Sequence, residues 1–147
     1  MKKKLTGLIV AGVAMFALSG CGGGGDVYYD DGIVATPPVN NETTLFLIDS
    51  GGFSAAGVEY TCVNSFGDVL GPFYTKANGE FTFEPGENCT FELIGFDGTP
   101  ADPLFIESDI GQPKDGIPYD CIGGDFGLTD LAGSFDYLMD DSCTFAF

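Results

Sequence analysis

Short apolar segments separated by turns run from Leu45 to the C-terminus. Within these segments apolar and polar residues alternate, as in Tyr60–Cys62 and Phe81–Phe83. A period of two places every second side chain on the same face of an extended chain, which predicts half-buried β-strands. Turn residues separate the segments, most clearly Asn78 and Gly79, a strong signal for a β-hairpin. Because this region carries no helical stripe, the pattern predicts an all-β fold.

The strand-like segments occur twice, first in residues 45–93 and again in residues 104–147. The alignment of the two repeats starts without a gap at an offset of 59 positions (121 − 62), which brings Cys62 over Cys121. After a deletion of five residues the offset is 54 positions. Such self-similarity predicts two copies of one structural unit. The aligned segments are 45–62 with 104–121, 75–83 with 129–137, and 89–91 with 143–145.

Each repeat contains four strand-like segments. We therefore predict one β-sandwich of about eight short strands in residues 44–147, with a closed barrel as the alternative. Pro118 lies in the second segment of the second repeat, and because proline cannot donate to a sheet ladder, we expect this strand at an edge or with a bulge. The chain contains 14 phenylalanines, and we assign nearly all of those in the repeats to the core.

Four cysteines fall on the apolar faces of the predicted strands, one on the second and one on the fourth segment of each repeat. In an exported domain this number suggests two disulfides, for which the sequence permits three connectivities. The equivalence of the repeats favours bridges within a repeat, each contributing about 3–4 kcal/mol in the chain-entropy model. Metal ligation is the alternative, although Cys-x-x-Cys spacing and histidine are both missing. The expected pairs are Cys62 with Cys89 and Cys121 with Cys143.

The N-terminus combines the basic Met1–Lys4, an apolar run from Leu5 to Leu18 and small residues before Cys21. Residues Leu18–Cys21 resemble the lipobox of bacterial lipoprotein signal peptides. The resemblance implies that residues 1–20 are removed, that Cys21 receives a diacylglyceryl group, and that its new amino group is acylated. The alternatives are an ordinary secretory signal, in which Cys21 is incidental, and an uncleaved anchor.

Residues 21–43 contain the lipidated cysteine, four glycines after it, and the pair Pro37 and Pro38, which is the composition of a tether. In Gram-negative lipoproteins the residue after the acylated cysteine influences sorting, and Gly22 in that place favours the outer membrane over inner-membrane retention. We therefore expect a protein anchored by lipid in the outer membrane. Whether its domain faces the cell surface or the periplasm stays open, as does the Gram type of the source.

The chain is strongly acidic, with a formal net charge of −17. Loss of three signal-peptide lysines would leave 2 − 22 = −20. This charge excludes a nucleic-acid partner. Only the lipid would then attach the acidic domain to the membrane. The expected partner is an unknown protein or glycan. A calcium site is a weaker hypothesis, because no EF-hand spacing is present and a solvated acidic edge explains the same residues. The candidate ligands are Asp125, Asp130, Asp136, Asp140 and Asp141.

Three motifs recur in the repeats: Gly-Val-x-Tyr-x-Cys, Thr-x-x-x-Gly-x-Phe and Cys-Thr-Phe. Together they resemble β-sandwich repeats of bacterial surface lipoproteins and large envelope adhesins. The second motif is also similar to a turn and strand of carboxypeptidase-regulatory-like, transthyretin-like domains. The resemblance implies a stalk, spacer or binding domain. The second repeat departs from the pattern at Leu131 and Ala132, before its glycine.

Catalytic motifs are missing from the sequence. The chain has no histidine, no Gly-x-Ser-x-Gly elbow and no phosphate-binding loop. The adjacent pairs Asp30–Asp31 and Asp140–Asp141 would point to opposite faces of a strand or into solvent. We therefore expect no enzyme and no cofactor beyond the lipid on Cys21, but a membrane-anchored binding, adhesion or assembly module. The alternatives are a periplasm-facing structural accessory of a larger envelope or secretion machine and a calcium-binding surface domain.

Overall fold

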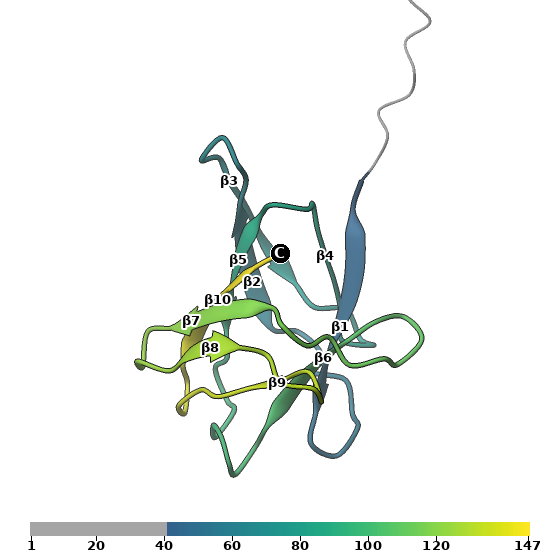
Figure 1. Cartoon of the computed structure of the whole chain (residues 1–147), viewed down its shortest axis with the longest axis vertical. Helices are drawn as coiled ribbons and strands as arrows, with labels where there is room; N and C mark the ends of the chain where they lie inside the picture. The colour runs from purple at the N-terminus through teal and green to yellow at the C-terminus, as the bar shows by residue number, and fades with distance from the viewer. Residues whose placement is uncertain (1–40) are drawn as a thin grey trace, which may run out of the picture. The chain divides into compact units, whose positions relative to one another are not determined.

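The computed structural model describes residues 41–147, which fold into two antiparallel β-sheets packed face to face (Figure 1). This all-β sandwich confirms the predicted fold class. The predictions for the signal peptide, for Cys21 and for most of the tether lie outside the described residues. The first strand starts at Thr43, where we expected the tether to end.

The first sheet has the order β4-β1-β6-β9 and the second has the order β3-β2-β5-β10-β7-β8. All neighbouring strands are antiparallel. The strands are β1 (Thr43–Asp49), β2 (Glu59–Val63), β3 (Val69–Tyr74), β4 (Glu80–Phe83), β5 (Asn88–Glu92), β6 (Leu104–Glu107), β7 (Pro118–Cys121), β8 (Phe126–Leu128), β9 (Ser134–Phe135) and β10 (Ser142–Ala146).

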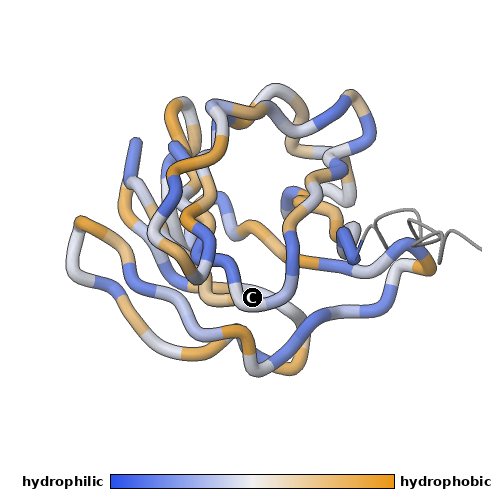
Figure 2. The backbone as a smooth tube through the Cα atoms, turned by 90° about the horizontal axis from the view of Figure 1, so that it is seen from above, coloured by the Kyte–Doolittle hydropathy of each residue, from blue (hydrophilic) through white to orange (hydrophobic). Residues whose placement is uncertain are grey.

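The predicted alternation sorts side chains between the core and the outside. Along β5, for example, Cys89 and Phe91 are buried between more exposed neighbours. Hydrophobic and hydrophilic segments alternate along the backbone in the same way (Figure 2). In both repeats two buried phenylalanines meet edge to face, Phe81 on Phe91 at 4.9 Å between ring centroids and Phe135 on Phe145 at 4.8 Å.

The two repeats are halves of one sandwich, related by an approximate two-fold axis. Strands β1–β5 correspond to β6–β10, and the halves meet where β1 pairs with β6 and β5 pairs with β10. At these seams equivalent residues face each other, Leu47 opposite Ile106 and Thr90 opposite Thr144. The two threonine hydroxyls are hydrogen-bonded at 2.7 Å. Each repeat therefore contributes strands to both sheets and half of a shared core.

The motif residues of the repeats have structural roles. The hydroxyl of Thr75 accepts a hydrogen bond from the Val58 N–H at 2.9 Å and donates one to the Ala55 carbonyl at 2.6 Å. Thr129 makes the equivalent two bonds in the second repeat, at 3.0 and 2.7 Å. The tyrosine of the first motif is Tyr60 in one repeat and Tyr119 in the other, and each hydroxyl accepts a hydrogen bond from a backbone N–H group. These residues join loops and strands of the fold.

Three expectations need correction. The turn at Asn78 and Gly79 does not close a β-hairpin, because the strands on either side of it lie in different sheets, where β3 pairs with β2 and β4 pairs with β1. Residues 41–147 form ten strands instead of about eight, because each repeat contains an additional strand, β3 or β8, at an edge of the larger sheet. The strand of Pro118 is not an edge strand, since β7 lies between β10 and β8, and the register shift that marks a bulge lies in the β2–β3 pair. Pro118 is tolerated because it is the first residue of β7, where its missing N–H disrupts no ladder.

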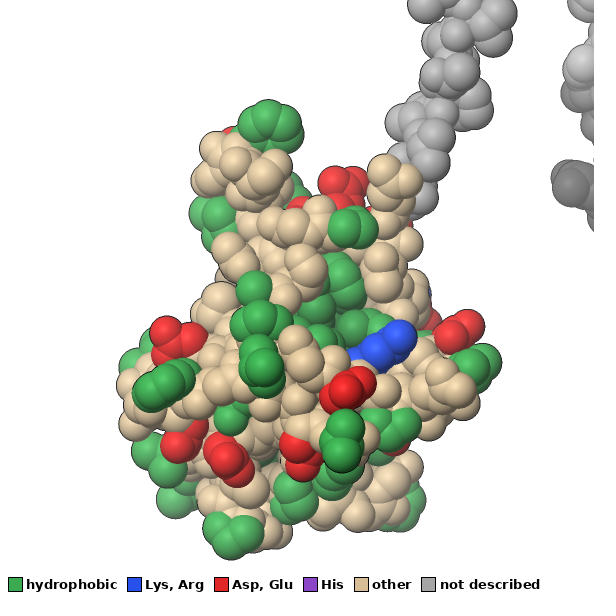
Figure 3. Space-filling model, in the orientation of Figure 1, with side chains coloured by type: hydrophobic (Ala, Val, Ile, Leu, Met, Phe, Trp, Pro, Cys, Tyr) green, Lys and Arg blue, Asp and Glu red, His purple; other side chains and the backbone are tan. Residues whose placement is uncertain are grey.

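The β2–β3 hairpin projects from the body of the domain, and hydrophobic side chains lie at its tip (Figures 1 and 3). All six residues of β3 are exposed. The corresponding β7–β8 hairpin is shorter, as the five-residue deletion in the alignment requires.

Candidate functional site

Each repeat contains one disulfide between cysteines that face each other on neighbouring strands. Cys62 on β2 is bonded to Cys89 on β5, and Cys121 on β7 is bonded to Cys143 on β10. All four are almost completely buried. The pairing within repeats that the sequence favoured is therefore confirmed.

A buried carboxylate lies beside each disulfide. Glu87 and Asp141 occupy equivalent positions, two residues before Cys89 and Cys143, and are only 4% and 6% exposed. In each group a carboxylate oxygen and both sulfurs lie within 4.8 Å of one another. A metal would need a deprotonated thiolate, which a disulfide sulfur is not. With the disulfides formed, these two groups are not metal centres.

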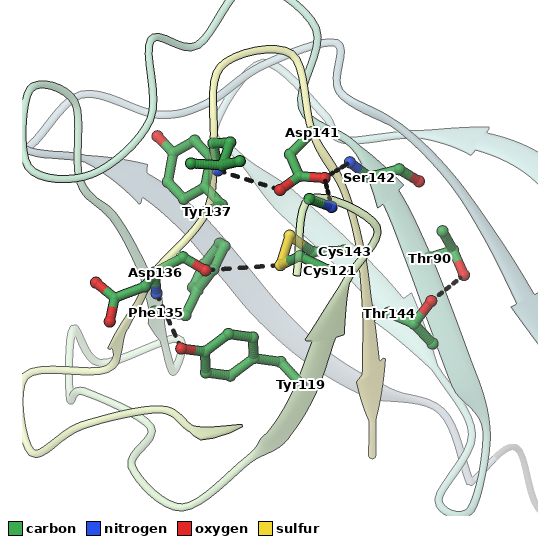
Figure 4. Close-up of a disulfide and its surroundings, with 12 residues drawn as sticks. Thr90, Tyr119, Cys121, Phe135, Asp136, Tyr137, Asp141, Ser142, Cys143 and Thr144 are labelled. Carbon is green, nitrogen blue, oxygen red and sulfur yellow. Dashed lines mark hydrogen bonds between the residues drawn. A yellow bond between two sulfur atoms is a disulfide. The ribbon is translucent and has the colours of Figure 1, made fainter. Parts of the chain in front are cut away.

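The Asp141 carboxylate is fully used by the fold. It accepts hydrogen bonds from the backbone N–H groups of Ser142 at 2.8 Å, Gly123 at 2.9 Å and Leu138 at 3.1 Å (Figure 4). Burial raises the pKa of Asp141, but the three backbone hydrogen bonds outweigh it and hold the pKa below its ordinary value. Asp141 is thus a structural residue that fixes the end of the β7–β8 hairpin to β10.

The Glu87 carboxylate accepts only one backbone N–H group, compared with three at Asp141. Its Oε2 accepts the N–H of Glu84 at 2.9 Å, which is the counterpart of the bond from Leu138 to Asp141. Its Oε1 is buried and has no hydrogen-bond partner among the described residues. The position of Gly123 in the first repeat is occupied by Asn64, whose N–H instead donates to the Asp68 carbonyl at 3.1 Å within the longer hairpin. The longer hairpin therefore lacks one of the two donors that bind Oδ1 of Asp141, the Gly123 N–H; the other donor is the N–H of Ser142.

A cavity of about 130 Å³ has Glu87 among its lining residues. Its walls come from β3, from the end of β4 and from the turn that leads into β5. They combine carboxylates with apolar and aromatic side chains, a combination that suits an organic cation. The lining includes Glu42, Leu70, Phe73, Phe83, Glu84 and Glu87.

The five predicted calcium ligands do not gather at one place. Asp130 closes its own turn by accepting hydrogen bonds from Ala132 and Ser134, and Asp140 accepts the N–H of Gly95 at 2.7 Å. Asp125 is partly buried, whereas Asp136 is exposed. Within residues 41–147, no three of these acids bring ligand oxygens within 4.8 Å of one another. Calcium binding stays a prediction.

Sequence reasoning missed Glu87. A signal was present, because the repeat alignment places an acid two residues before the last cysteine in both repeats. What the alignment does not reveal is that only one of the two acids finds enough backbone donors.

Comparisons with known proteins do not add a functional assignment. No protein-family profile matches the chain, and no curated protein or solved structure is significantly similar to it. In the described part of the chain no helix is long and apolar enough to span a membrane. The functional argument therefore rests on the residues themselves.

Proposed function

We infer that the protein is a lipid-anchored lipoprotein of the bacterial outer membrane whose β-sandwich serves as a non-catalytic binding, adhesion or assembly module. The observation that carries this proposal is the sequence Leu18–Cys21 behind a basic and apolar leader, which resembles a lipobox. The two buried disulfides support export, since disulfides persist in oxidising compartments.

Exposed aromatic side chains support a binding role. Phe66 in the β2–β3 hairpin is 89% exposed, and Phe126 on the opposite edge strand of the same sheet is 77% exposed. Hydrophobic side chains also lie open between acidic ones on the face seen in Figure 3. Exposed apolar and aromatic groups of this kind are typical of contact surfaces. The partner would be a protein or a glycan.

The anchor is tested by growing cells with an alkyne-bearing fatty acid and detecting its transfer to the protein. Wild-type protein is expected to carry the label and to fractionate with outer membranes. The Cys21→Ser variant should lose both the label and the membrane association. An unlabelled wild-type protein would contradict the lipoprotein assignment.

The side of the membrane is tested by antibody labelling of intact cells and of cells with a permeabilised outer membrane. Labelling of intact cells would support an adhesion or surface-binding role. Labelling only after permeabilisation would exclude adhesion and favour the alternative of a structural accessory facing the periplasm.

A further inference from the structure

We propose that the tip of the β2–β3 hairpin, residues 64–69, inserts into the interface of the phospholipid bilayer that holds the lipid anchor. This proposal rests on the proposed function, because it requires an anchor at Cys21, and it adds a second membrane contact that orients the domain. It assigns the exposed Phe66 to the membrane and leaves Phe126, at the other edge of the sheet, for a partner molecule. The position of the hairpin, its exposed side chains and its hydrogen bonds support the proposal.

The hairpin lies at the end of the sandwich where the chain enters the first strand. Figure 1 shows the hairpin and the start of β1 at this end, and Glu42, just before β1, lines the same cavity as Leu70 and Phe73 of β3. A tether of about 20 residues has a typical reach of roughly 25 Å. An anchor at Cys21 would therefore hold this end of the domain near the bilayer, with the hairpin beside the point of entry.

The apolar side chains at the tip are not used by the fold. Phe66 is 89% exposed and Val69 is 71% exposed. The equivalent β7–β8 hairpin shows that the sandwich does not need them, because this hairpin is shorter by the five residues of the alignment and its strands still pair. Exposed apolar groups without a packing role are typical of surfaces that contact another molecule or a membrane, and aromatic rings are enriched at membrane interfaces.

The tip satisfies its own polar groups. The side-chain Oδ1 of Asn64 accepts the N–H of Phe66 at 3.0 Å and the N–H of Asp68 at 2.9 Å. The N–H of Gly67 donates to the Asn64 carbonyl at 3.0 Å, and the Asp68 carboxylate accepts a bond from the Asn64 amide at 3.2 Å. Because unpaired polar groups are costly in lipid, a turn closed by its own hydrogen bonds can enter the interface without exposing free backbone donors.

The distribution of charge favours this end of the sheet over the opposite end. The loops 94–97 and 138–141 lie at the opposite end and also expose apolar side chains, Ile94 and Met139. These two loops contain three aspartates, whereas the hairpin tip contains one. Anionic headgroups repel carboxylates within a short distance of the surface. The hairpin is therefore the apolar end that a bilayer accepts more readily.

The anchor makes a small insertion sufficient. Two apolar side chains would bind a bilayer only weakly from solution. A tether converts this second contact into an intramolecular event at a high effective concentration, so that a weak contact still orients the anchored domain.

The chain contains no tryptophan, so that a single tryptophan reports on one position. The lipidated variants Phe66→Trp and Phe126→Trp are reconstituted in vesicles of phosphatidylethanolamine with a minor share of phosphatidylglycerol, with and without bromine on the acyl chains. Phe126 is the control, because it is 77% exposed on the other edge strand. Bromination is expected to lower the emission of Phe66→Trp at least about twofold and that of Phe126→Trp by less than about a tenth, because only a side chain at the acyl boundary meets the bromine atoms.

Two matched charge variants locate the contact. Both are made in the Phe66→Trp protein: Val69→Asp adds a charge to the tip, and Leu128→Asp adds the same charge to β8. Val69→Asp is expected to reduce the quenching at least about threefold, because burial of a charge opposes insertion, whereas Leu128→Asp should leave the quenching unchanged. Both side chains are exposed, so both variants should keep the melting temperature of the parent protein.

Three results in a lipidated protein that floats with the vesicles would overturn the proposal: no quenching of Phe66→Trp, equal quenching of the two tryptophan variants, or unchanged quenching in Val69→Asp. The first result would assign the hairpin to a protein or glycan partner instead. Mass spectrometry of the same samples measures lipidation. A lipidated protein without quenching removes only the hairpin contact, an unlipidated protein with quenching of Phe66→Trp removes only the anchor, and an unlipidated protein without quenching removes both.

Discussion

Asp141 and Glu87 show how strongly the role of one carboxylate depends on the loop beside it. Both acids precede a disulfide cysteine by two residues, and both are almost fully buried. Asp141 accepts three backbone N–H groups, whereas Glu87 accepts one. Part of the difference arises in the β2–β3 and β7–β8 hairpins, because the Gly123 N–H that Asp141 accepts belongs to the turn of the β7–β8 hairpin.

Replacing Asp141 by asparagine is expected to lower the free energy of unfolding by about 2 kcal/mol, because hydrogen bonds to a charged acceptor are lost and the new amide N–H₂ faces backbone donors. Urea denaturation of the two proteins measures the difference. The neighbouring Asp140→Asn is the control, since the exposed Asp140 accepts a single bond, from Gly95, and asparagine tolerates its positive φ of 53°. Equal losses in the two variants would contradict the structural role of Asp141.

The lowered pKa of Asp141 predicts acid sensitivity. Burial alone would raise this pKa, but the backbone hydrogen bonds lower it by more than burial raises it. The folded state therefore holds the proton less tightly than the unfolded state. The stabilisation is complete above the unfolded pKa of about 4 and is lost as the pH falls through the lower folded pKa. In melting curves from pH 6 to pH 2, the difference between wild type and Asp141→Asn should therefore shrink below about pH 4. A constant difference would contradict this linkage.

The glycine of the Thr-x-x-x-Gly-x-Phe motif is required for a close backbone contact. Gly79 has a φ of +78°, and a Cβ atom there would lie 2.3 Å from the Leu47 carbonyl oxygen. Gly57 has a similar φ of +75° but open space around it. Gly57→Ala should cost about 1–2 kcal/mol from the backbone conformation alone. Gly79→Ala should cost clearly more in the same denaturation experiment, and equal costs would show that the contact has no influence.

At the scale of elements, alternation predicts the strands that bury one face. It locates the segments that became β1, β2, β4 and β5 and their counterparts, because there the core selects every second side chain. It misses β3, which exposes all six residues and contains Gly71 and Pro72. It also misses β8, which has only three residues. Both strands exist through pairing with a neighbouring strand, which leaves no periodic mark on the sequence.

Local sequence patterns likewise predict only part of the candidate site. Repeat equivalence was sufficient to predict the disulfides, because both cysteines of each pair lie on strands with a core-facing pattern. The cavity at Glu87 depends on the length and path of the β2–β3 hairpin, which no local pattern encodes. The acid candidates predicted from the sequence are dispersed: Asp130 accepts N–H groups within its own turn, whereas Asp140 accepts the N–H of Gly95 from another loop.

The disulfides are expected to stabilise the two halves to a similar extent. Their sequence separations are 27 and 22 residues, for which chain entropy gives about 3–4 kcal/mol each. The double variants Cys62→Ala/Cys89→Ala and Cys121→Ala/Cys143→Ala should therefore lose comparable free energies of unfolding. Urea denaturation under non-reducing conditions measures both. If only one of the two double variants lost free energy of unfolding, the two halves would not share their stability.

At the scale of the molecule, the repeat predicted two copies of a unit but not how they combine. Tandem repeats can form separate domains in a row or share one core. Here the seams join equivalent residues, Leu47 to Ile106 and Thr90 to Thr144, so each half provides the edges that the other half covers. This self-complementary pairing is a tertiary property that the alignment alone does not specify.

The symmetry predicts that the halves stay together without a covalent link. No disulfide crosses between repeats, and the seams consist of the β1–β6 and β5–β10 pairs with Phe91 packed on Phe145 across them. A protease site inserted at the exposed Asp97, between β5 and β6, allows the folded protein to be cut there. The cut protein is expected to elute as one particle in native buffer and to separate into two parts in urea without reductant.

The uncut protein with the same insertion is the control for any effect of the added residues. Co-elution after cutting requires that the contacts at the seams and in the common core contribute more free energy than the entropy gained on separation. Separation in native buffer at micromolar concentration would show that the linker of residues 94–103 holds the halves together. Cohesion in native buffer and separation in urea would instead establish that one repeat serves as the folding partner of the other.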